Sequence, residues 1–282
     1  MTEVSSLLGD AARRLLAAGV DSPRLDARLL LAHALRRPPD SLVGTIEIPP
    51  EAVVPFDELI ARRIQREPVA YITGHKEFWS LDFEVGPGVL APRPETETLI
   101  ELALDRLPDR QARLTAIDLG TGSGCLIAAF LSEYPNARGV GVDASAGALE
   151  WARRNLERHG LSHRCRLELG DWSDFFVADA DVIFSNPPYI PSEDYSRLAP
   201  EVRLYEPVAA LDGGEGGLAA LRSLSRQMAR LLRPQGLGFV EIGAGQADAA
   251  GRVFRETGLK VAEIAPDLAG IPRCVAVERP PE

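Results

Sequence analysis

The sequence predicts an α/β protein in which a seven-stranded parallel sheet, covered by helices on both faces, follows a small helical N-terminal domain. Two observations carry this prediction. From about residue 114 onward, short apolar segments alternate with segments of helical periodicity, which is typical of a parallel sheet with helices on both faces. Before residue 66, apolar residues recur at helical spacing. We therefore expect a domain over 1–85, made of helices and a hairpin, and a sheet domain over 86–282.

Three helices are expected in the N-terminal region, where apolar residues recur at helical spacing over 4–19, 22–38 and 50–67. Ser22 precedes Pro23 as an N-cap residue precedes a proline at the first helical position. The three helices suggest a small bundle without a catalytic constellation. This bundle could stabilise the protein or bind a macromolecular substrate, and the sequence leaves both roles open.

After residue 68 the apolar period shifts toward two. Segments 70–73 and 77–85 suggest a hairpin with Gly74 at its turn. Segment 86–94 carries two glycines and three prolines, so it is the best candidate for a linker. A helix is expected from about Glu95 to the residues before Pro108.

The sheet domain follows from seven apolar segments. The expected strands are 114–119, 139–142, 165–169, 181–185, 236–242, 259–264 and 274–277. The helices expected between them are 125–132, 146–159, 218–232 and 246–257.

Composition narrows the class of protein. Hydrophobic residues make up 45% of the 282 residues, which supports a real core. The sequence has neither an apolar run long enough to span a bilayer nor a signal-peptide layout at its start, so we expect a soluble, cytoplasmic protein. The net charge is −10, from 31 basic and 41 acidic residues, which argues against duplex nucleic acid as the main partner.

Cysteine and histidine offer no metal site. The three cysteines are isolated and lie in apolar contexts, so buried free thiols explain them better than disulfides or zinc. His159 and His163 are four residues apart, but a metal cluster needs more ligands than these two.

The stretch Asp181 to Tyr189 reads as a buried strand that ends in Asn186-Pro187-Pro188-Tyr189. Consecutive prolines fix φ and remove two backbone donors, which leaves carbonyl groups free. An asparagine side chain offers one acceptor and two donors, and tyrosine adds a flat face. These residues describe a rigid cradle for a planar, amide-like group, although Asn-Pro-Pro is also common as a strand-ending turn.

A glycine-rich turn lies at the first junction of strand and helix, from Asp118 to Gly124. Its glycines let the backbone pass close to a ligand that faces the N–H groups of the helix. The dinucleotide-binding pattern requires a glycine where Cys125 stands, and no Gly-Lys-Ser/Thr follows as in a P-loop. The loop therefore suits a nucleoside ligand without a pyrophosphate, and a plain glycine-rich turn is the alternative.

Two acidic positions follow the next two strands. Asp143 lies 23 residues after Gly120, which is the offset of an acid that accepts hydrogen bonds from ribose hydroxyls. Asp171-Trp172 follows the third strand, where the carboxylate could accept from an adenine amine and the ring could pack on the base. Asp171 could equally cap a short helix that begins at Trp172.

A glycine-rich turn, a ribose acid, a base-facing acid and Asn-Pro-Pro-Tyr thus fall on four strands in order. This arrangement resembles the S-adenosylmethionine-dependent methyltransferases with a Rossmann-like, seven-stranded sheet. The last motif resembles that of enzymes that methylate planar, conjugated nitrogen, either the exocyclic amines of bases or glutamine side-chain amides.

Further motifs narrow the resemblance. They are Arg66 to Gly74, His75 to Trp79, Pro92 to Glu97, Val202-Arg203, and Glu206-Pro207 with Ala210-Leu211. In this order they look like the release-factor glutamine N5-methyltransferases, and the match extends over nearly the whole chain. The N-terminal helices match that family only in general character.

That resemblance implies S-adenosylmethionine as the cofactor and peptide chain release factors as protein substrates, with no membrane and no direct nucleic-acid binding. The implied cofactor-binding residues are Gly120, Thr121, Gly122, Ser123, Gly124, Asp143, Asp171, Trp172 and Asn186. The implied substrate-binding residues are Asn186, Pro187, Pro188 and Tyr189, and of these Asn186, Pro187 and Tyr189 are expected to be catalytic. Phe78 and the Arg93-Pro94 turn are expected to form walls of the site.

The chemistry is consistent with this family. The lone pair of an amide nitrogen is delocalised, but the Asn186 side-chain oxygen and the Pro187 carbonyl could accept both of its N–H groups. They would aim the nitrogen at the methyl group while Tyr189 packs on the amide plane. Glutamate lacks these N–H groups and would be rejected.

Two other functions remain open. A methyltransferase acting on adenine or cytosine in DNA or RNA would use the same cradle on a flipped base, although the acidic balance argues against it. A nucleoside-binding module whose helical bundle serves assembly is a third candidate, but binding alone would not require an amide cradle.

Overall fold

The computed structural model describes residues 2–42, 47–175 and 179–281. The chain forms two compact units. Unit 1 is Met1–His75 with Ala199–Tyr205, and unit 2 is Lys76–Leu198 with Glu206–Glu282. The boundary falls after His75, so nearly all of the hairpin belongs to unit 2, and a segment from the second half of the chain belongs to unit 1.

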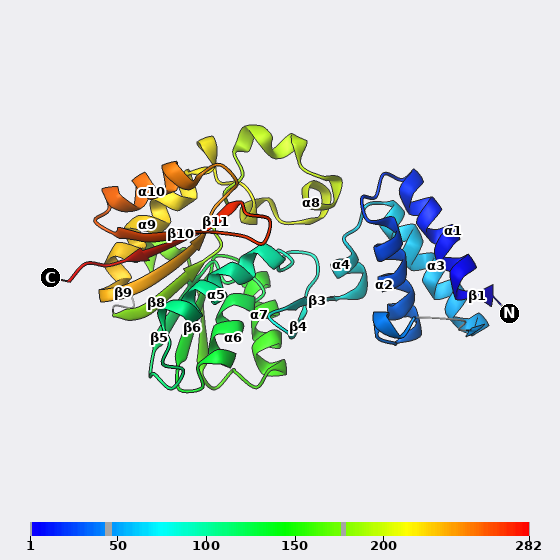
Figure 1. The fold of residues 1–282 in the computed structure, drawn as a ribbon, viewed down its shortest axis with the longest axis horizontal. Coiled ribbons are helices and arrows are strands. Elements are labelled where there is room, and N and C mark those ends of the chain that lie inside the picture. The colour runs from blue at the N-terminus through cyan, green and yellow to red at the C-terminus, as the bar shows by residue number, and fades with distance from the viewer. Residues whose placement is uncertain (1, 43–46, 176–178, 282) are drawn as a thin grey trace. The chain divides into compact units, whose positions relative to one another are not determined.

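Unit 1 is a helical bundle, and its three expected N-terminal helices are present (Figure 1). Its elements are β1 (Thr2–Glu3), α1 (Val4–Ala17), α2 (Pro23–Leu35), η1 (Pro39–Ser41), β2 (Glu47–Ile48), α3 (Pro50–Ile64), α4 (Val69–Thr73) and α8 (Pro200–Tyr205). Helix α2 begins at Pro23, whose fixed φ suits the first helical position. Leu15, Leu30 and Ile60 are fully buried in the core of the bundle.

The expected strand over 70–73 is wrong, since these residues lie in the short helix α4. The helix ends at Gly74, which has a φ of 78° and so is a left-handed C-cap rather than a hairpin turn. The hairpin pairs β3 (His75–Phe78) with β4 (Leu81–Glu84). Its turn residues Trp79 and Ser80 both have positive φ, as in a tight two-residue hairpin. A segment of four residues is too short for periodicity to separate helix from strand.

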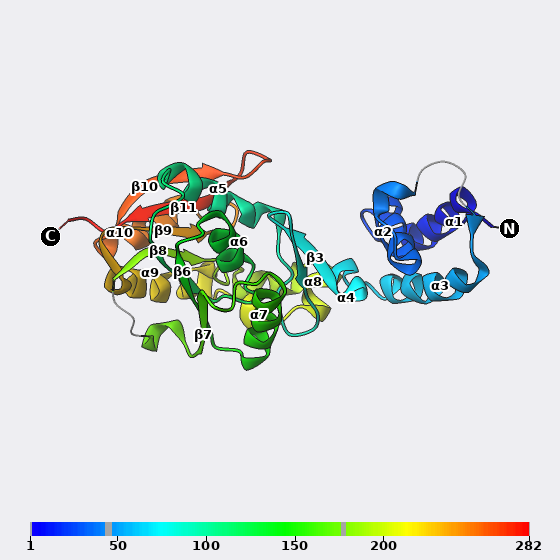
Figure 2. The ribbon, with the colours of Figure 1, turned by 90° about the horizontal axis from the view of Figure 1, so that it is seen from below.

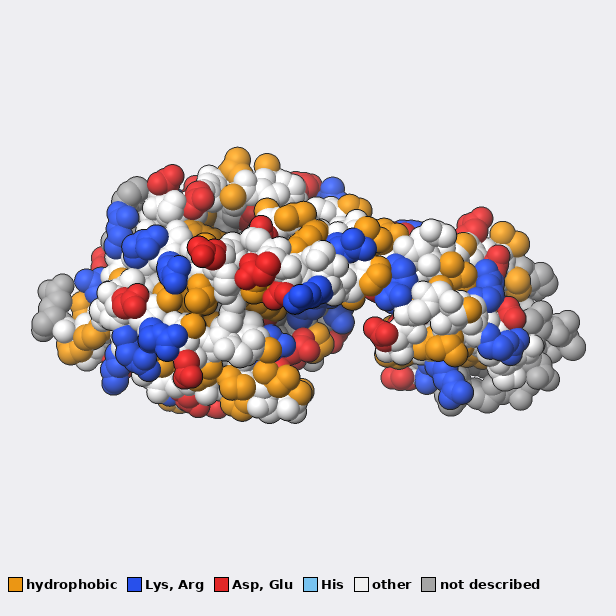
Figure 3. Space-filling view, turned by 90° about the horizontal axis from the view of Figure 1, so that it is seen from above, with side chains coloured by type: hydrophobic (Ala, Val, Ile, Leu, Met, Phe, Trp, Pro, Cys, Tyr) orange, Lys and Arg blue, Asp and Glu red, His pale blue; other side chains and the backbone are white. Residues whose placement is uncertain are grey.

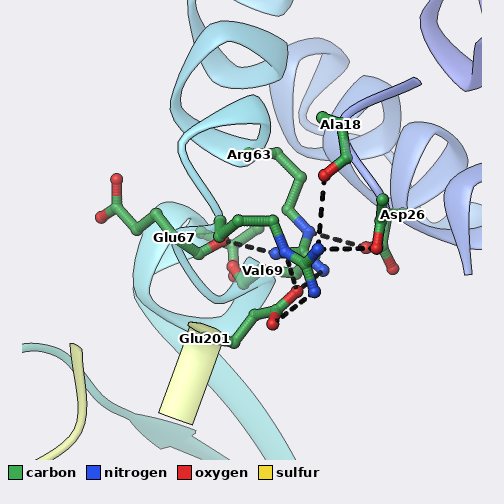
Figure 4. A network of polar contacts seen from close by, with 9 residues as sticks. Ala18, Asp26, Arg63, Glu67, Val69 and Glu201 are labelled. Carbon is green, nitrogen blue, oxygen red and sulfur yellow. Dashed lines mark hydrogen bonds and ion pairs between the residues drawn. The ribbon is translucent and has the colours of Figure 1, made fainter. Parts of the chain in front are cut away.

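The segment 199–205 is tied to unit 1 by an ion-pair network around Glu201 (Figure 4). Arg66 donates to both carboxylate oxygens of Glu201, each over 2.7 Å. Arg63 lies between two acids and donates to Glu201 over 2.8 Å and to Asp26 over 2.7 Å. Arg66 also donates to the carbonyl of Gly19, so α8 is held to the first helices of the chain.

Unit 2 is built on a seven-stranded sheet of order β10-β11-β9-β8-β5-β6-β7 (Figure 1). The strands are β5 (Thr115–Leu119), β6 (Arg138–Asp143), β7 (Cys165–Leu169), β8 (Ala180–Ser185), β9 (Leu232–Glu241), β10 (Lys260–Pro266) and β11 (Pro272–Glu278). The seven expected strands are all present.

The expectation of a wholly parallel sheet is wrong for one strand. β11 runs antiparallel to both of its neighbours, β9 and β10. Only residues 267–271 connect β10 to β11, and a parallel connection needs a crossover of a dozen or more residues. A short link after β10 therefore forces an antiparallel strand.

Helices cover both faces of the sheet, as expected (Figures 1 and 2). One face carries α5 (Glu97–Arg106), α6 (Cys125–Glu133) and α7 (Ala146–Arg158), and the other carries α9 (Ala219–Leu231) and α10 (Ala247–Glu256). The chain runs outward from β5 to β6 and β7, then crosses back to β8 on the other side of β5. The sheet thus reverses its order between β5 and β8, and ligands bind at the carboxyl ends of strands at such a point.

The remaining short helices lie in the loops of unit 2. They are η2 (Pro94–Thr96), η3 (Trp172–Asp174), η4 (Ser192–Arg197), η5 (Val208–Ala210) and η6 (Glu215–Gly217). Among the described residues, no helix has the length and apolar character needed to cross a membrane. Cys125 and Cys274 are buried free thiols as expected, whereas Cys165 is half-buried.

The network in Figure 4 predicts a pH-dependent stability of unit 1. Burial raises the pKa of Glu201, but hydrogen bonds from Arg66 and Arg63 outweigh it and hold the pKa below its usual range. A depressed carboxyl pKa stabilises the fold above the ordinary pKa, and this contribution disappears as the pH falls through the folded-state pKa. Glu201→Gln should lower the free energy of unfolding by about 2 kcal/mol at pH 7, measured by urea unfolding.

The matched control for that substitution is Glu193→Gln, because Glu193 is exposed on the same connection. The control should leave the urea midpoint unchanged. Equal midpoints for the wild type and Glu201→Gln at pH 7 would contradict the stabilising role of the network.

Candidate active site

A cavity of about 450 Å³ opens at the carboxyl ends of β5, β6, β7 and β8 in unit 2. It is lined by Gly88, Val89, Leu90, Pro92, Arg93, Thr96, Gly120, Thr121, Gly122, Ser123, Cys125, Leu126, Asp143, Ala144, Ser145, Ala148, Gly170, Asp171, Trp172, Asn186, Pro188, Pro207, Ala209 and Ala210. Its position at the reversal of strand order is where a doubly wound sheet binds its ligand.

The glycine-rich loop forms the floor of the cavity between β5 and α6. Gly120 has a φ of 79°, and a Cβ at that position would lie 3.1 Å from the ring of Trp172. A side chain there would be strained and would crowd the tryptophan, so glycine is required. The backbone N–H groups of Gly120 and Thr121 donate to the carbonyl of Val142, which fixes the loop to the end of β6.

Gly124 has a different role from the other loop residues. It is the left-handed N-cap of α6, and a Cβ there would lie 3.2 Å from the Cβ of Ala152 on α7. The glycine therefore allows α6 to pack closely on α7, and it is not among the cavity-lining residues.

Asp143 is placed at the cavity by its own backbone contacts. One carboxylate oxygen accepts from the N–H of Gly122 over 2.9 Å, and the other accepts from the N–H of Ser145 over 2.9 Å. Each oxygen has a further lone pair, so the side chain can accept two more hydrogen bonds from a vicinal diol.

Asp171 and Trp172 line the cavity beyond the end of β7. One oxygen of Asp171 accepts from the N–H of Ser173 over 2.8 Å, so Asp171 does cap the short helix η3. The cap uses one carboxylate oxygen of Asp171, and the residue still lines the cavity, so the other oxygen can accept from a ligand. The capping and ligand-binding interpretations are therefore compatible.

The Asn-Pro-Pro-Tyr motif begins at the end of β8, which is buried along its whole length. Ser185 donates to the carbonyl of Leu119 over 2.6 Å, which joins the ends of β8 and β5. Asn186 and Pro188 line the cavity, whereas Pro187 and Tyr189 do not. The Tyr189 hydroxyl instead donates to Glu241 over 3.1 Å, and the backbone carbonyl of Tyr189 accepts from the Gln246 side chain over 3.0 Å.

The cavity thus brings together most of the residues that the sequence predicts. Gly120, Thr121, Gly122, Ser123, Asp143, Asp171, Trp172, Asn186 and Pro188 line it, and Gly124, Pro187 and Tyr189 do not. Of the expected walls, Arg93 lines the cavity, while Phe78 is buried in the hairpin against Phe83.

The expected linker over 86–94 is instead a wall of the cavity. Val89 and Ala91 are buried, and Val89, Leu90, Pro92 and Arg93 line the cavity. Proline and glycine here shape a rigid, packed turn, and their frequency alone does not separate such a turn from an exposed connection.

Arg93 pairs with a buried acid that the sequence analysis did not single out for the site. It donates to both oxygens of Glu206, at 2.6 and 2.5 Å, and the Glu206 side chain is 1% exposed. Burial raises the pKa of Glu206, and the Arg93 guanidinium partly offsets this effect. The pair fixes the chain just before Pro207, Ala209 and Ala210, which line the cavity.

Two further buried side chains support the loop. The Asn155 amide of α7 donates to the carbonyl of Ser123 over 2.9 Å and exchanges two hydrogen bonds with the backbone of Glu84. Asp118 accepts from the hydroxyl of Thr121 over 2.7 Å, and burial raises the pKa of Asp118 to about 7. Two signals in the sequence could have pointed to these residues. They are an asparagine inside a helical segment and an aspartate inside an apolar strand.

These residues fit S-adenosylmethionine. Gly120 allows the Trp172 ring to pack against the glycine-rich loop at the cavity wall, and Asp143 and Asp171 supply acceptors at successive strand ends. Val89, Leu90 and Leu126 provide an apolar wall for a base. The fold and the site define a Rossmann-like, S-adenosylmethionine-dependent methyltransferase.

Comparisons with known proteins identify the particular family. Residues 81–214 match the family model described as a methyltransferase small domain, and residues 6–74 match the PrmC N-terminal domain. A release factor glutamine methyltransferase from Rhodospirillum rubrum is 43% identical over 275 residues, which cover 97% of this chain and 84% of that relative. Another from Caulobacter vibrioides is 42% identical over 265 residues, which cover 93% and 91%.

The chain belongs to the release factor glutamine methyltransferase family, which confirms the resemblance seen in its motifs. A solved methyltransferase from Pyrococcus furiosus matches with a TM-score of 0.53 and 20% identity, covering 78% of this chain and 97% of that one. That likeness supports the methyltransferase fold.

The geometry of Asp143 predicts its contribution to cofactor affinity. Asp143→Asn removes the negative charge that strengthens hydrogen bonds from ribose hydroxyls, so the Kd for S-adenosylmethionine should rise about tenfold. Isothermal titration calorimetry measures this change. Asp174→Asn, at an exposed position of η3, is the control and should keep the wild-type Kd. An unchanged Kd for Asp143→Asn would argue against ribose binding at this carboxylate.

Proposed function

We propose that this protein transfers a methyl group from S-adenosylmethionine to the side-chain amide nitrogen of the glutamine in the Gly-Gly-Gln loop of peptide chain release factors. The observation that carries the proposal is the position of Asn186. It follows β8 and lines the same cavity as the glycine-rich loop after β5, the neighbouring strand. A cofactor on that loop and an amide at Asn186 would therefore meet in one cavity.

The cofactor supplies a methyl group on a sulfonium centre. The chain's own contribution is to orient a weakly nucleophilic amide. In this proposal the Asn186 side-chain oxygen, at the cavity wall, and the carbonyl of the adjacent Pro187, which is not itself among the lining residues, accept the two N–H groups of the substrate glutamine and direct its nitrogen toward the methyl group. Charge that develops on this nitrogen is stabilised by the same two acceptors, and its proton leaves after transfer.

Tyr189 is assigned to the amide plane of the substrate as the residue that follows Pro188 in the motif, although it is not among the cavity-lining residues. Its hydroxyl donates to Glu241 and its backbone carbonyl accepts from Gln246, so both the side chain and the backbone of Tyr189 are anchored. The packing of this ring on the substrate remains a prediction. In the same way, we assign recognition of the release factor to the helical bundle of unit 1, whose residues 6–74 match the family's N-terminal domain.

The surface charge supports a protein substrate over a nucleic acid. On the face of unit 2 drawn in Figure 3, basic and acidic side chains are interspersed. A nucleic-acid track would present a basic stripe, and the net charge of −10 does not favour one.

The direct test offers labelled S-adenosylmethionine to the protein with a bacterial-type release factor and nucleic acid in one reaction. Label should enter the release factor, at the glutamine of its Gly-Gly-Gln loop, as located by mass spectrometry. A release factor with that glutamine replaced by glutamate should take up no label, because its side chain lacks N–H groups. Label in nucleic acid with none in the release factor would instead identify a base methyltransferase.

A second prediction concerns the cradle. Asn186→Ala removes the side-chain acceptor, so methyl transfer should fall to background, while the Kd for S-adenosylmethionine rises only modestly. Single-turnover transfer and calorimetry measure the two effects separately. Full activity in Asn186→Ala would eliminate the cradle from the mechanism.

A further inference from the structure

A buried acid lies behind the Asn-Pro-Pro-Tyr motif and is not part of the cavity wall. Glu241 ends β9, the strand next to β8, and is 2% exposed. Its Oε2 is 2.5 Å from the hydroxyl of Thr96, and its Oε1 is 3.1 Å from the hydroxyl of Tyr189. An ionisable group this deeply buried requires satisfied partners, and both of these partners are hydroxyl groups.

Thr96 connects this acid to the cavity. It is the last residue of η2, is 2% exposed and lines the cavity. Its Oγ1 lies 3.2 Å from the side-chain nitrogen of Asn186. A continuous chain of hydrogen bonds therefore runs from Asn186 through Thr96 to Glu241.

The charge of Glu241 sets the direction of this chain. When Glu241 is ionised, its carboxylate only accepts hydrogen bonds, so the single hydroxyl proton of Thr96 is committed to Glu241. The Thr96 oxygen can then only accept from its other neighbour, and the NH₂ group of Asn186 donates to it. The amide of Asn186 is thereby held with its nitrogen toward Thr96, which leaves its oxygen as the group available to a ligand.

We infer that Glu241 and Thr96 are positioning residues that keep the Asn186 side-chain oxygen turned toward the substrate amide. The inference rests on the proposed function, because only a substrate with N–H groups needs an acceptor at this place. With the amide turned the other way, Asn186 would present N–H groups to the N–H groups of glutamine. The buried acid thus selects an amide substrate without touching it.

Neutralising Glu241 removes this directional control. In Glu241→Gln the new amide can donate to Thr96, whose proton is then free to turn to Asn186. Both orientations of Asn186 become accessible, although the shape of the buried residue is nearly unchanged. Thr96→Val removes the hydroxyl at similar volume, whereas Thr96→Ser keeps it.

Because the orientation of Asn186 depends on the charge of Glu241, methyl transfer should slow when Glu241 becomes protonated at low pH. Burial is the largest effect and raises the pKa of Glu241 above its usual range, with a further increase from Glu95, although hydrogen bonds from Thr96 and Tyr189 and the charge of Arg273 partly offset this rise. Cys274 on β11 also faces Glu241, but burial holds its thiol protonated. Transfer should therefore be fastest above the pKa of Glu241 and fall as the pH drops through it. Glu241→Gln should lack this acid limb.

The test compares kcat and KM for a release factor, the Kd for S-adenosylmethionine and the pH profile across these variants. Glu241→Gln and Thr96→Val should lose about 10- to 100-fold in kcat, with the cofactor Kd within about threefold of wild type. Thr96→Ser should recover most of the activity that Thr96→Val loses. Glu256→Gln, an exposed acid at the end of α10, is the matched control.

Wild-type kcat in folded Glu241→Gln, or equal losses in Thr96→Ser and Thr96→Val, would overturn the positioning role. If Glu241→Gln does not fold, the Thr96 pair decides alone. Failure of the proposed function is distinguishable, because the wild-type protein would then transfer no methyl group to the release factor in the same assay.

Discussion

The neighbouring parallel strands β5 and β8 hold the two halves of the site together. β5 leads into the glycine-rich loop and β8 leads into Asn186, and the Ser185 hydroxyl joins their ends through the carbonyl of Leu119. Parallel strands end at the same edge of a sheet, so the loop and the asparagine cannot be far apart. The rest of unit 2 adds acceptors, walls and support around this fixed pair.

Support for the site comes from polar groups that are buried behind it. Asn155 ties the loop to the hairpin, Glu206 fixes Arg93, and Glu241 reaches Asn186 through Thr96. Each of these three groups joins segments more than 30 residues apart in the chain, so no pattern within one element indicates the contact. Buried hydrogen bonds of this kind are satisfied only in one arrangement, so they make the site rigid.

Between Leu198 and Glu206 the chain passes from unit 2 into unit 1 and returns. Its residues 199–205 belong to unit 1, where Glu201 pairs with Arg63 and Arg66. The chain then returns to unit 2, where Glu206 pairs with Arg93 before Pro207 lines the cavity. Ion pairs therefore hold this connection on both sides.

The sequence by itself determined the order of strands and helices, the glycine-rich loop, the acids after β6 and β7 and the Asn-Pro-Pro-Tyr motif, because these are local patterns. It failed at residues 70–73, where the apolar segment is too short to have a readable period, and at β11, whose direction depends on a short connection. Only the tertiary structure decided that 86–94 is a cavity wall and that Thr96 and Glu241 support Asn186. Those contacts join distant segments, and no local pattern of charge or hydrophobicity encodes which buried acid meets which hydroxyl.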